Sequence, residues 1–212
     1  IILIINKKTT PNGKRRNLHF LPFVVYFRDK SKGGLFRGGS LCFGKKKLSI
    51  NMAEFIHGNQ SIHYELAGVR EFRLRTPVLL LHGNGEDMHI FDNMIAPLLG
   101  AKGFVLMDSR MQGESFSLDG GGEISYSAMA DDAAALMDEL GINEYDIVGY
   151  SDGGIIALLM AMKSFKVRRF FTIGANTDPS GLTAKAVREI KTALRRANHK
   201  GDERTAALLS MM

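Results

Sequence analysis

The fold of this chain is indicated by one stretch, YDIVGYSDGGIIALLMAM at residues 145–162. It begins as a strand-like run and ends as an apolar helical run, with Gly-x-Ser-x-Gly between them. In a sharp strand-to-helix turn, the residues two before and two after the apex must be nearly free of side chain, and Gly149 and Gly153 meet that demand. The pattern predicts a nucleophile elbow with Ser151 at its apex. The plainer interpretation, a glycine-rich turn with a solvated serine, does not account for the strand and helix on either side.

A second motif, TPVLLLHGNG at residues 76–85, is a fully apolar run that ends in a glycine-rich loop. Such runs are typical of parallel strands that are buried on both faces. Small residues in the loop would let a backbone N–H group approach the elbow, so we expect the N–H groups of Asn84 and Asp152 to form a two-donor oxyanion hole. We interpret His82 as a hydrogen-bonded structural histidine and not as the catalytic base.

With these two motifs the chain resembles the α/β-hydrolase superfamily, in particular small microbial esterases, lactonases and C–C-bond hydrolases. The resemblance runs from about Phe55 to the last residue, and it includes FVLMDSRMQGES at 104–115, similar to the family's Asp-x-Arg-Gly-x-Gly-x-Ser loop. Met111 stands where that pattern has its first glycine. Relatives that remove halide carry aspartate at the elbow apex, so Ser151 disfavours dehalogenation.

The alternation of elements supports the same α/β fold class, a mostly parallel sheet with helices on both faces. Strands are expected near 54–57, 61–66, 77–82, 103–108, 145–150 and 168–174, and helices over 127–140, the run after the elbow, 182–198 and 202–211. We therefore expect a hydrolase core over 52–180 and the start of a helical cap over 181–212.

The first 51 residues differ in charge from the rest of the chain. They hold 12 Lys and Arg against one acid, Asp29, so they carry a net charge of +11, whereas the other 161 residues carry −5. We interpret residues 1–51 as an extension outside the fold. The alternatives are a basic arm for nucleic acid or an anionic membrane, or a targeting peptide around residues 20–27. The single cysteine, Cys42, excludes an internal disulfide and favours the reducing cytoplasm.

The resemblance also implies which catalytic groups should follow the serine. The family order is Ser, then Asp or Glu, then His, with the last two after strands that this sequence does not show. His199 lies in a helix-end context and is not assigned as the base; Asp178 is a candidate acid, although an aspartate before a proline is commonly a turn residue. The fold would then be incomplete at its C-terminal side, the chain nearly inactive, and an apolar sheet edge unpaired and prone to self-association.

Three functions remain from the sequence. The first is a cofactor-independent serine hydrolase that acts on a small ester, lactone or related acyl substrate through an acyl-enzyme, with Ser151 as nucleophile. The second is a non-catalytic binding protein or degenerate fragment, and the third a basic-arm interaction protein that acts through residues 1–51. We expect no metal, since one cysteine and six histidines show no zinc-ligand spacing. We expect a small-molecule partner and neither nucleic acid nor membrane; lyase and perhydrolase chemistry stay open.

Overall fold

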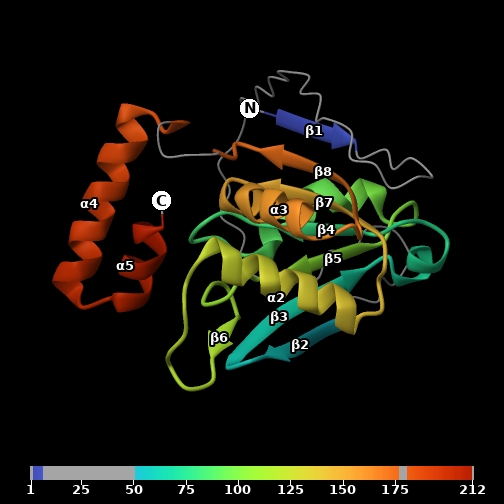
Figure 1. Ribbon diagram of the computed structural model, residues 1–212, viewed down its shortest axis with the longest axis horizontal. Coiled ribbons are helices and arrows are strands. Elements are labelled where there is room, and N and C mark those ends of the chain that lie inside the picture. Colours follow the sequence, from blue (N-terminus) through green and yellow to red (C-terminus); the bar gives the residue numbers. More distant parts are fainter. Residues whose placement is uncertain (1, 7–50, 177–180, 212) are drawn as a thin grey trace.

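The computed structural model describes residues 2–6, 51–176 and 181–211, which form a mixed sheet with helices on both faces (Figure 1). The strand order is β1-β8-β7-β4-β5-β3-β2, and β6 pairs with β3. The strands are β1 (Ile2–Asn6), β2 (Asn51–His57), β3 (Gln60–Ala67), β4 (Val78–Leu81), β5 (Phe104–Met107), β6 (Phe116–Ser117), β7 (Tyr145–Tyr150) and β8 (Val167–Ile173). The central strands β5, β4, β7 and β8 are parallel, and the pairs outside them are antiparallel. The predicted α/β class is confirmed.

The central strand β4 shows why this sequence forms a sheet that is covered on both sides. Successive side chains of a strand point to opposite faces. Leu79 and Leu81 therefore pack into the larger core under α2 and α3, whereas Val78 and Leu80 pack into a second core with Phe91 and other apolar residues of the segment 88–98. The unbroken apolar run is what such a position requires.

The helices lie between the parallel strands and after them. They are η1 (Val69–Arg73), η2 (Met88–Phe91), α1 (Asp92–Ile95), η3 (Ala96–Leu98), α2 (Tyr126–Glu139), α3 (Asp152–Lys163), α4 (Ala184–Lys200) and α5 (Glu203–Ser210). Ser125 caps the start of α2, because its side chain accepts a hydrogen bond from the N–H of Ala128. α3 is mostly buried as expected, except that Met162 is 82% exposed. Of the helices described, none has the length and apolar character needed to cross a membrane.

The N-terminal strand β1 overturns one expectation. We expected residues 1–51 to lie outside the fold, but all of residues 2–6 pair antiparallel with β8, from Ile2 opposite Ile173 to Asn6 opposite Arg169. The apolar, β-branched run at residues 2–6 has the composition that favours a strand. β8 therefore has a neighbour on each side, and the apolar strand β1 takes its place at the edge of the sheet. The rest of the basic extension, 7–50, lies outside the described residues, and self-association stays a prediction.

The C-terminal helices α4 and α5 pack against each other at one end of the molecule (Figure 1). Thr183 caps the start of α4, and Gly201 ends it in a left-handed conformation. The pair is attached to the core through α5: Leu208 is buried in the larger core, and its carbonyl accepts a hydrogen bond from the Asn84 side chain at 2.8 Å. The helical segments predicted for the cap are thus present, and α5 reaches the loop after β4.

Candidate active site

The turn between β7 and α3 has the geometry of a nucleophile elbow. Ser151 has φ 51° and ψ −116°, and it is one of two non-glycine residues with positive φ in the part of the chain described. Its N–H donates to the carbonyl of Ile173 at 2.7 Å, and its carbonyl accepts from Gly154 at 2.9 Å. A backbone held in this sparsely populated region costs about 1–3 kcal/mol and persists only where the surrounding structure fixes it. The predicted apex is therefore present, with its strain.

The two glycines of the motif are required by close contacts. A Cβ atom on Gly149 would lie 2.3 Å from the carbonyl oxygen of Gly153, and one on Gly153 would lie 2.0 Å from that of Leu81. Both distances are shorter than any real Cβ contact. The predicted reason for these glycines, the tightness of the turn, is confirmed, and Gly153 also lets α3 approach the end of β4.

The loop after β4 lies against the elbow, as the second motif predicts. A Cβ atom on Gly83 would lie 3.2 Å from the Cβ of Ser151. In the same loop the Gly83 N–H donates to the Glu86 carboxylate at 3.0 Å, and the Gly85 N–H donates to Gln112 Oε1 at 2.6 Å. Among the described residues no acceptor takes the N–H of Asn84, which lies between these two.

Asp152 is the first residue of α3, so its N–H has no acceptor within the helix. The two N–H groups expected to form the oxyanion hole are therefore both without an acceptor in this region. They come from segments that meet beside Ser151.

The buried histidine of this loop is structural, as expected. His82 Nδ1 lies 2.7 Å from the carbonyl oxygen of Gly83, and its Nε2 lies 2.9 Å from the N–H of Ser109. Because Nε2 accepts that hydrogen bond, the ring proton is on Nδ1 and is donated to Gly83. Both ring nitrogens are occupied, so His82 cannot take a proton from Ser151 without losing a backbone contact.

The loop after β5 contacts the loop after β4, since Gln112 accepts the hydrogen bond from Gly85. Asp108 Oδ1 accepts from the N–H of Met88, and its Oδ2 from that of Glu114, both at 2.8 Å. Met111 has φ 61°, the left-handed conformation that the glycine of the family pattern would adopt without strain. Met111 therefore has the left-handed backbone conformation that favours glycine, the residue of the family pattern at this position.

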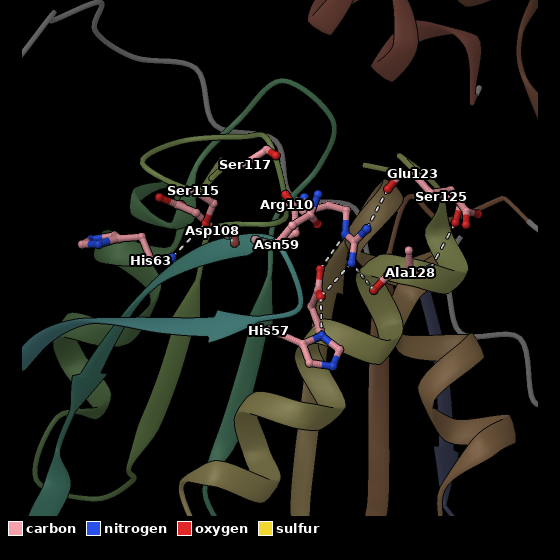
Figure 2. Close-up of polar contacts among 12 residues, drawn as sticks. His57, Asn59, His63, Asp108, Arg110, Ser115, Ser117, Glu123, Ser125 and Ala128 are labelled. Atoms are coloured by element: carbon pink, nitrogen blue, oxygen red, sulfur yellow. Dashed lines mark hydrogen bonds and ion pairs between the residues drawn. The ribbon is translucent and has the colours of Figure 1, made fainter. Parts of the chain in front are cut away.

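Arg110 and Asp132 form a buried ion pair beside this loop. Figure 2 shows Arg110 with its contacts to Glu123 and Ala128. Arg110 donates from Nε and Nη2 to the two carboxylate oxygens at 2.7 and 2.8 Å, and His57 Nδ1 lies 2.8 Å from Oδ1. The side chain of Asp132 is fully buried. Arg110 also donates to the carbonyl of Glu123, so it joins the loop after β5 to the segment before α2. Sequence reasoning missed this network, although Arg110 lies in the segment that carries the family resemblance.

Asp152, the residue after Ser151, was expected to contribute only its backbone N–H, but its side chain also lies in a distinctive environment. The Asp152 side chain is buried, and burial raises the pKa of its carboxyl although hydrogen bonds from the Tyr126 and Asn84 side chains and the proximity of His82 act to lower it. Its Oδ2 atom has no hydrogen-bond partner. Burial also raises the pKa of the Tyr126 hydroxyl, and the nearby Asp152 carboxylate raises it further.

The remaining candidate groups do not join this site. His199 is exposed in the last turn of α4, as the helix-end interpretation expected, and Asp178 lies outside the described residues. No histidine of the described residues forms a hydrogen bond with Ser151. In the same residues no group of three or more His, Cys, Asp or Glu could hold a metal ion. A hollow lined by Pro77 and Ile142 lies at the N-terminal ends of β4 and β7, away from Ser151.

Comparison with known proteins agrees with this geometry. The chain is similar to Est816, described as an N-acyl homoserine lactone degrading enzyme, with 20% identity, a TM-score of 0.54, and 75% of this chain and 64% of that one covered. It is also similar to a hydrolase from Pseudomonas aeruginosa PA01, with 22% identity, a TM-score of 0.53, and coverage of 68% and 53%. The chain spans less than two thirds of the solved structures that it matches, down to 37%. The family model for the alpha/beta hydrolase fold matches residues 76–197, more than half of the sequence. This chain therefore belongs to the α/β hydrolase fold family.

Proposed function

We propose that this chain carries the nucleophile and oxyanion site of a cofactor-independent serine hydrolase that acts on a small ester, lactone or related acyl compound. The observation that carries the proposal is the strained backbone of Ser151, at φ 51°, between a parallel strand and the first turn of α3. Strain of this kind, in a turn enforced by two glycines, exposes a side chain at the carboxyl end of the sheet, where ligands of open α/β folds bind.

In the proposed reaction, the Ser151 hydroxyl oxygen attacks the acyl carbon and its proton passes to a base. The carbonyl oxygen becomes an oxyanion, which the N–H groups of Asn84 and Asp152 stabilise by hydrogen bonds, helped by the positive end of the α3 dipole. Collapse of the intermediate breaks the bond between the acyl carbon and the alcohol oxygen, or the ring oxygen of a lactone; that oxygen takes up the proton from the base, and an acyl-enzyme remains. Water then hydrolyses the acyl-enzyme and restores the serine.

Among the described residues, neither a base nor an acid of a catalytic triad is placed beside Ser151. His82 is held by two backbone contacts, and His199 is exposed on α4. In a working triad, loss of the base lowers turnover by about a million-fold. We therefore propose that the 212-residue chain turns over ester substrates slowly at neutral pH.

Labelling with a neutral alkyl fluorophosphonate tests the nucleophile, because this reagent forms a covalent bond with an activated serine. We expect slow labelling of the full chain at one residue, its abolition in Ser151→Ala, and its retention in the control Ser127→Ala, which changes an exposed serine of α2. Turnover of p-nitrophenyl acetate, measured on the same variants, tests the proposed slow rate. Labelling that survives Ser151→Ala would refute the assignment of the nucleophile.

A second candidate is a binding protein of the same fold without catalysis, and it is supported by the lack, among the described residues, of a histidine that forms a hydrogen bond with Ser151. The two functions give different results in the labelling experiment, because a binding protein would show neither labelling nor turnover. The third function, a basic-arm interaction protein, rests on 7–50, outside the described residues. The cytoplasmic location expected from the single cysteine also stays a prediction.

A further inference from the structure

The Asp152 carboxylate has a buried oxygen that the proposed reaction does not use. The residue is 5% exposed, and Oδ2 is one of two buried side-chain oxygen or nitrogen atoms without a hydrogen-bond partner in the part of the chain described. The side chains of Asn84, in the loop after β4, and Tyr126, at the start of α2, lie near enough to this carboxylate to lower its pKa by hydrogen bonding, so both segments meet at Asp152. A buried polar atom without a partner is uncommon in proteins and calls for an explanation.

The charge of this carboxylate is also uncompensated. Within the described segments no lysine or arginine forms an ion pair with Asp152, whereas the buried Asp132 has Arg110 and the half-buried Asp146 has Arg168 and Arg169. The Glu86 carboxylate lies near enough to raise the pKa of Asp152 further. The region beside Ser151 therefore holds negative charge without a protein cation to balance it. A bound cation would gain from both carboxylates.

We propose that the Asp152 carboxylate binds a protonated amine of the substrate, so that the acyl compounds accepted by this site carry an ammonium group a few bonds from the acyl carbon. The inference rests on the proposed function, since it names the substrate class of the same site. An ammonium group supplies the hydrogen-bond donor that Oδ2 lacks, and charge-assisted hydrogen bonds are about twice as strong as neutral ones. Asp152 directly follows Ser151 in the chain, so adjacent residues would recognise the ammonium group and the acyl carbon of one substrate.

Two ligands that differ only in this group test the inference by binding to the full chain. L-Phenylalaninamide carries the ammonium group next to the carbonyl, and 3-phenylpropanamide lacks it. Titration at pH 7, followed by calorimetry or by amide chemical shifts, should show at least about tenfold tighter binding of the ammonium ligand, as one charge-assisted hydrogen bond implies. In Asp152→Asn, which keeps the shape and removes the charge, we expect the two ligands to bind within about twofold of each other.

The matched control is Asp131→Asn, which removes one negative charge from the exposed face of α2 and should keep the preference. If Asp152→Asn does not fold, as judged by circular dichroism, Asp152→Ser takes its place with the same expectation. Equal binding of the two ligands to the unmodified chain, binding of neither, or a preference that survives the Asp152 change would overturn the inference.

The outcomes separate this inference from the proposed function. Fluorophosphonate labelling of Ser151 without a preference for the ammonium ligand would leave the hydrolase proposal intact and remove only the substrate class. A preference that depends on Asp152, in a chain whose serine is never labelled, would support a site that recognises amines and would count against the hydrolase.

Discussion

The buried pair of Arg110 and Asp132 gives the sharpest prediction for stability. Arg110→Met keeps most of the volume of the arginine stem and removes the charge, so a fully buried carboxylate keeps only its contact with His57. Removal of one partner from a buried ion pair costs about 3–5 kcal/mol, because the other charge stays buried and unpaired. Whole domains are stable by only about 5–15 kcal/mol, so this change should remove a large part of the free energy of unfolding.

The assay is urea unfolding at pH 7, followed by circular dichroism, on four proteins: the unmodified chain, Arg110→Met, Asp132→Leu and the double variant. The double variant should recover most of the loss, since an apolar pair of similar volume replaces both charges and leaves neither unpaired. The control is Lys163→Met, which breaks the exposed pair between Lys163 and Asp131, also at 2.7 Å.

An exposed pair contributes only about 0–1 kcal/mol. The two pairs have the same shortest distance, but their removal should therefore lower the free energy of unfolding by unequal amounts. The reasoning would be refuted if Arg110→Met cost no more than Lys163→Met. It would also be refuted if the double variant were as unstable as the single arginine variant.

Three other changes test the site and the sheet. Gly153→Ala forces a Cβ to 2.0 Å from the Leu81 carbonyl, and we expect a loss of about 1–3 kcal/mol or more in urea unfolding and loss of fluorophosphonate labelling. Met111→Gly should be more stable than Met111→Ala by about 1 kcal/mol, because only glycine adopts φ 61° without strain; equal stability would contradict this. Burial alone would raise the pKa of Asp146, but hydrogen bonds and charge from Arg168 and its neighbour lower it below the usual 3.8. The stabilisation is thus present above about pH 4 and lost as the pH falls through the folded-state pKa, so the stability gap between Asp146→Asn and the unmodified chain should narrow in acid.

Most of the fold could be predicted from the sequence because its signals are local. The apolar run at 78–81 has the composition of a strand buried on both faces, and it lies at the centre of the sheet. The helix predicted over 127–140 starts within one residue of α2, because apolar residues such as Met129, Ala133 and Leu136 recur at helical spacing. The short helices over 88–98 were not predicted, since none of them is long enough to show a helical period.

The candidate site divides in the same way. The elbow needs only a strand, two glycines and a serine within five residues, so its position and its strain follow from local sterics. The side chains that hold the candidate site in place come from distant segments: Gln112 binds the loop after β4, Tyr126 of α2 contacts Asp152, and Asp132 pairs with Arg110. No periodicity links such residues, because their contacts exist only once the sheet has formed.

The sequence by itself determined the α/β class, the elbow at Ser151 and the glycine-rich loop that meets it, because close approach of backbones leaves glycine as the residue that fits. Only the tertiary structure decided that residues 2–6 pair with β8 and that Asn84 is tied to α5 by Leu208. It also decided that one buried oxygen of the Asp152 carboxylate, beside Ser151, has no hydrogen-bond partner. These are contacts between segments far apart in the chain, and their free energy depends on burial and on which groups surround each atom, which local sequence does not specify.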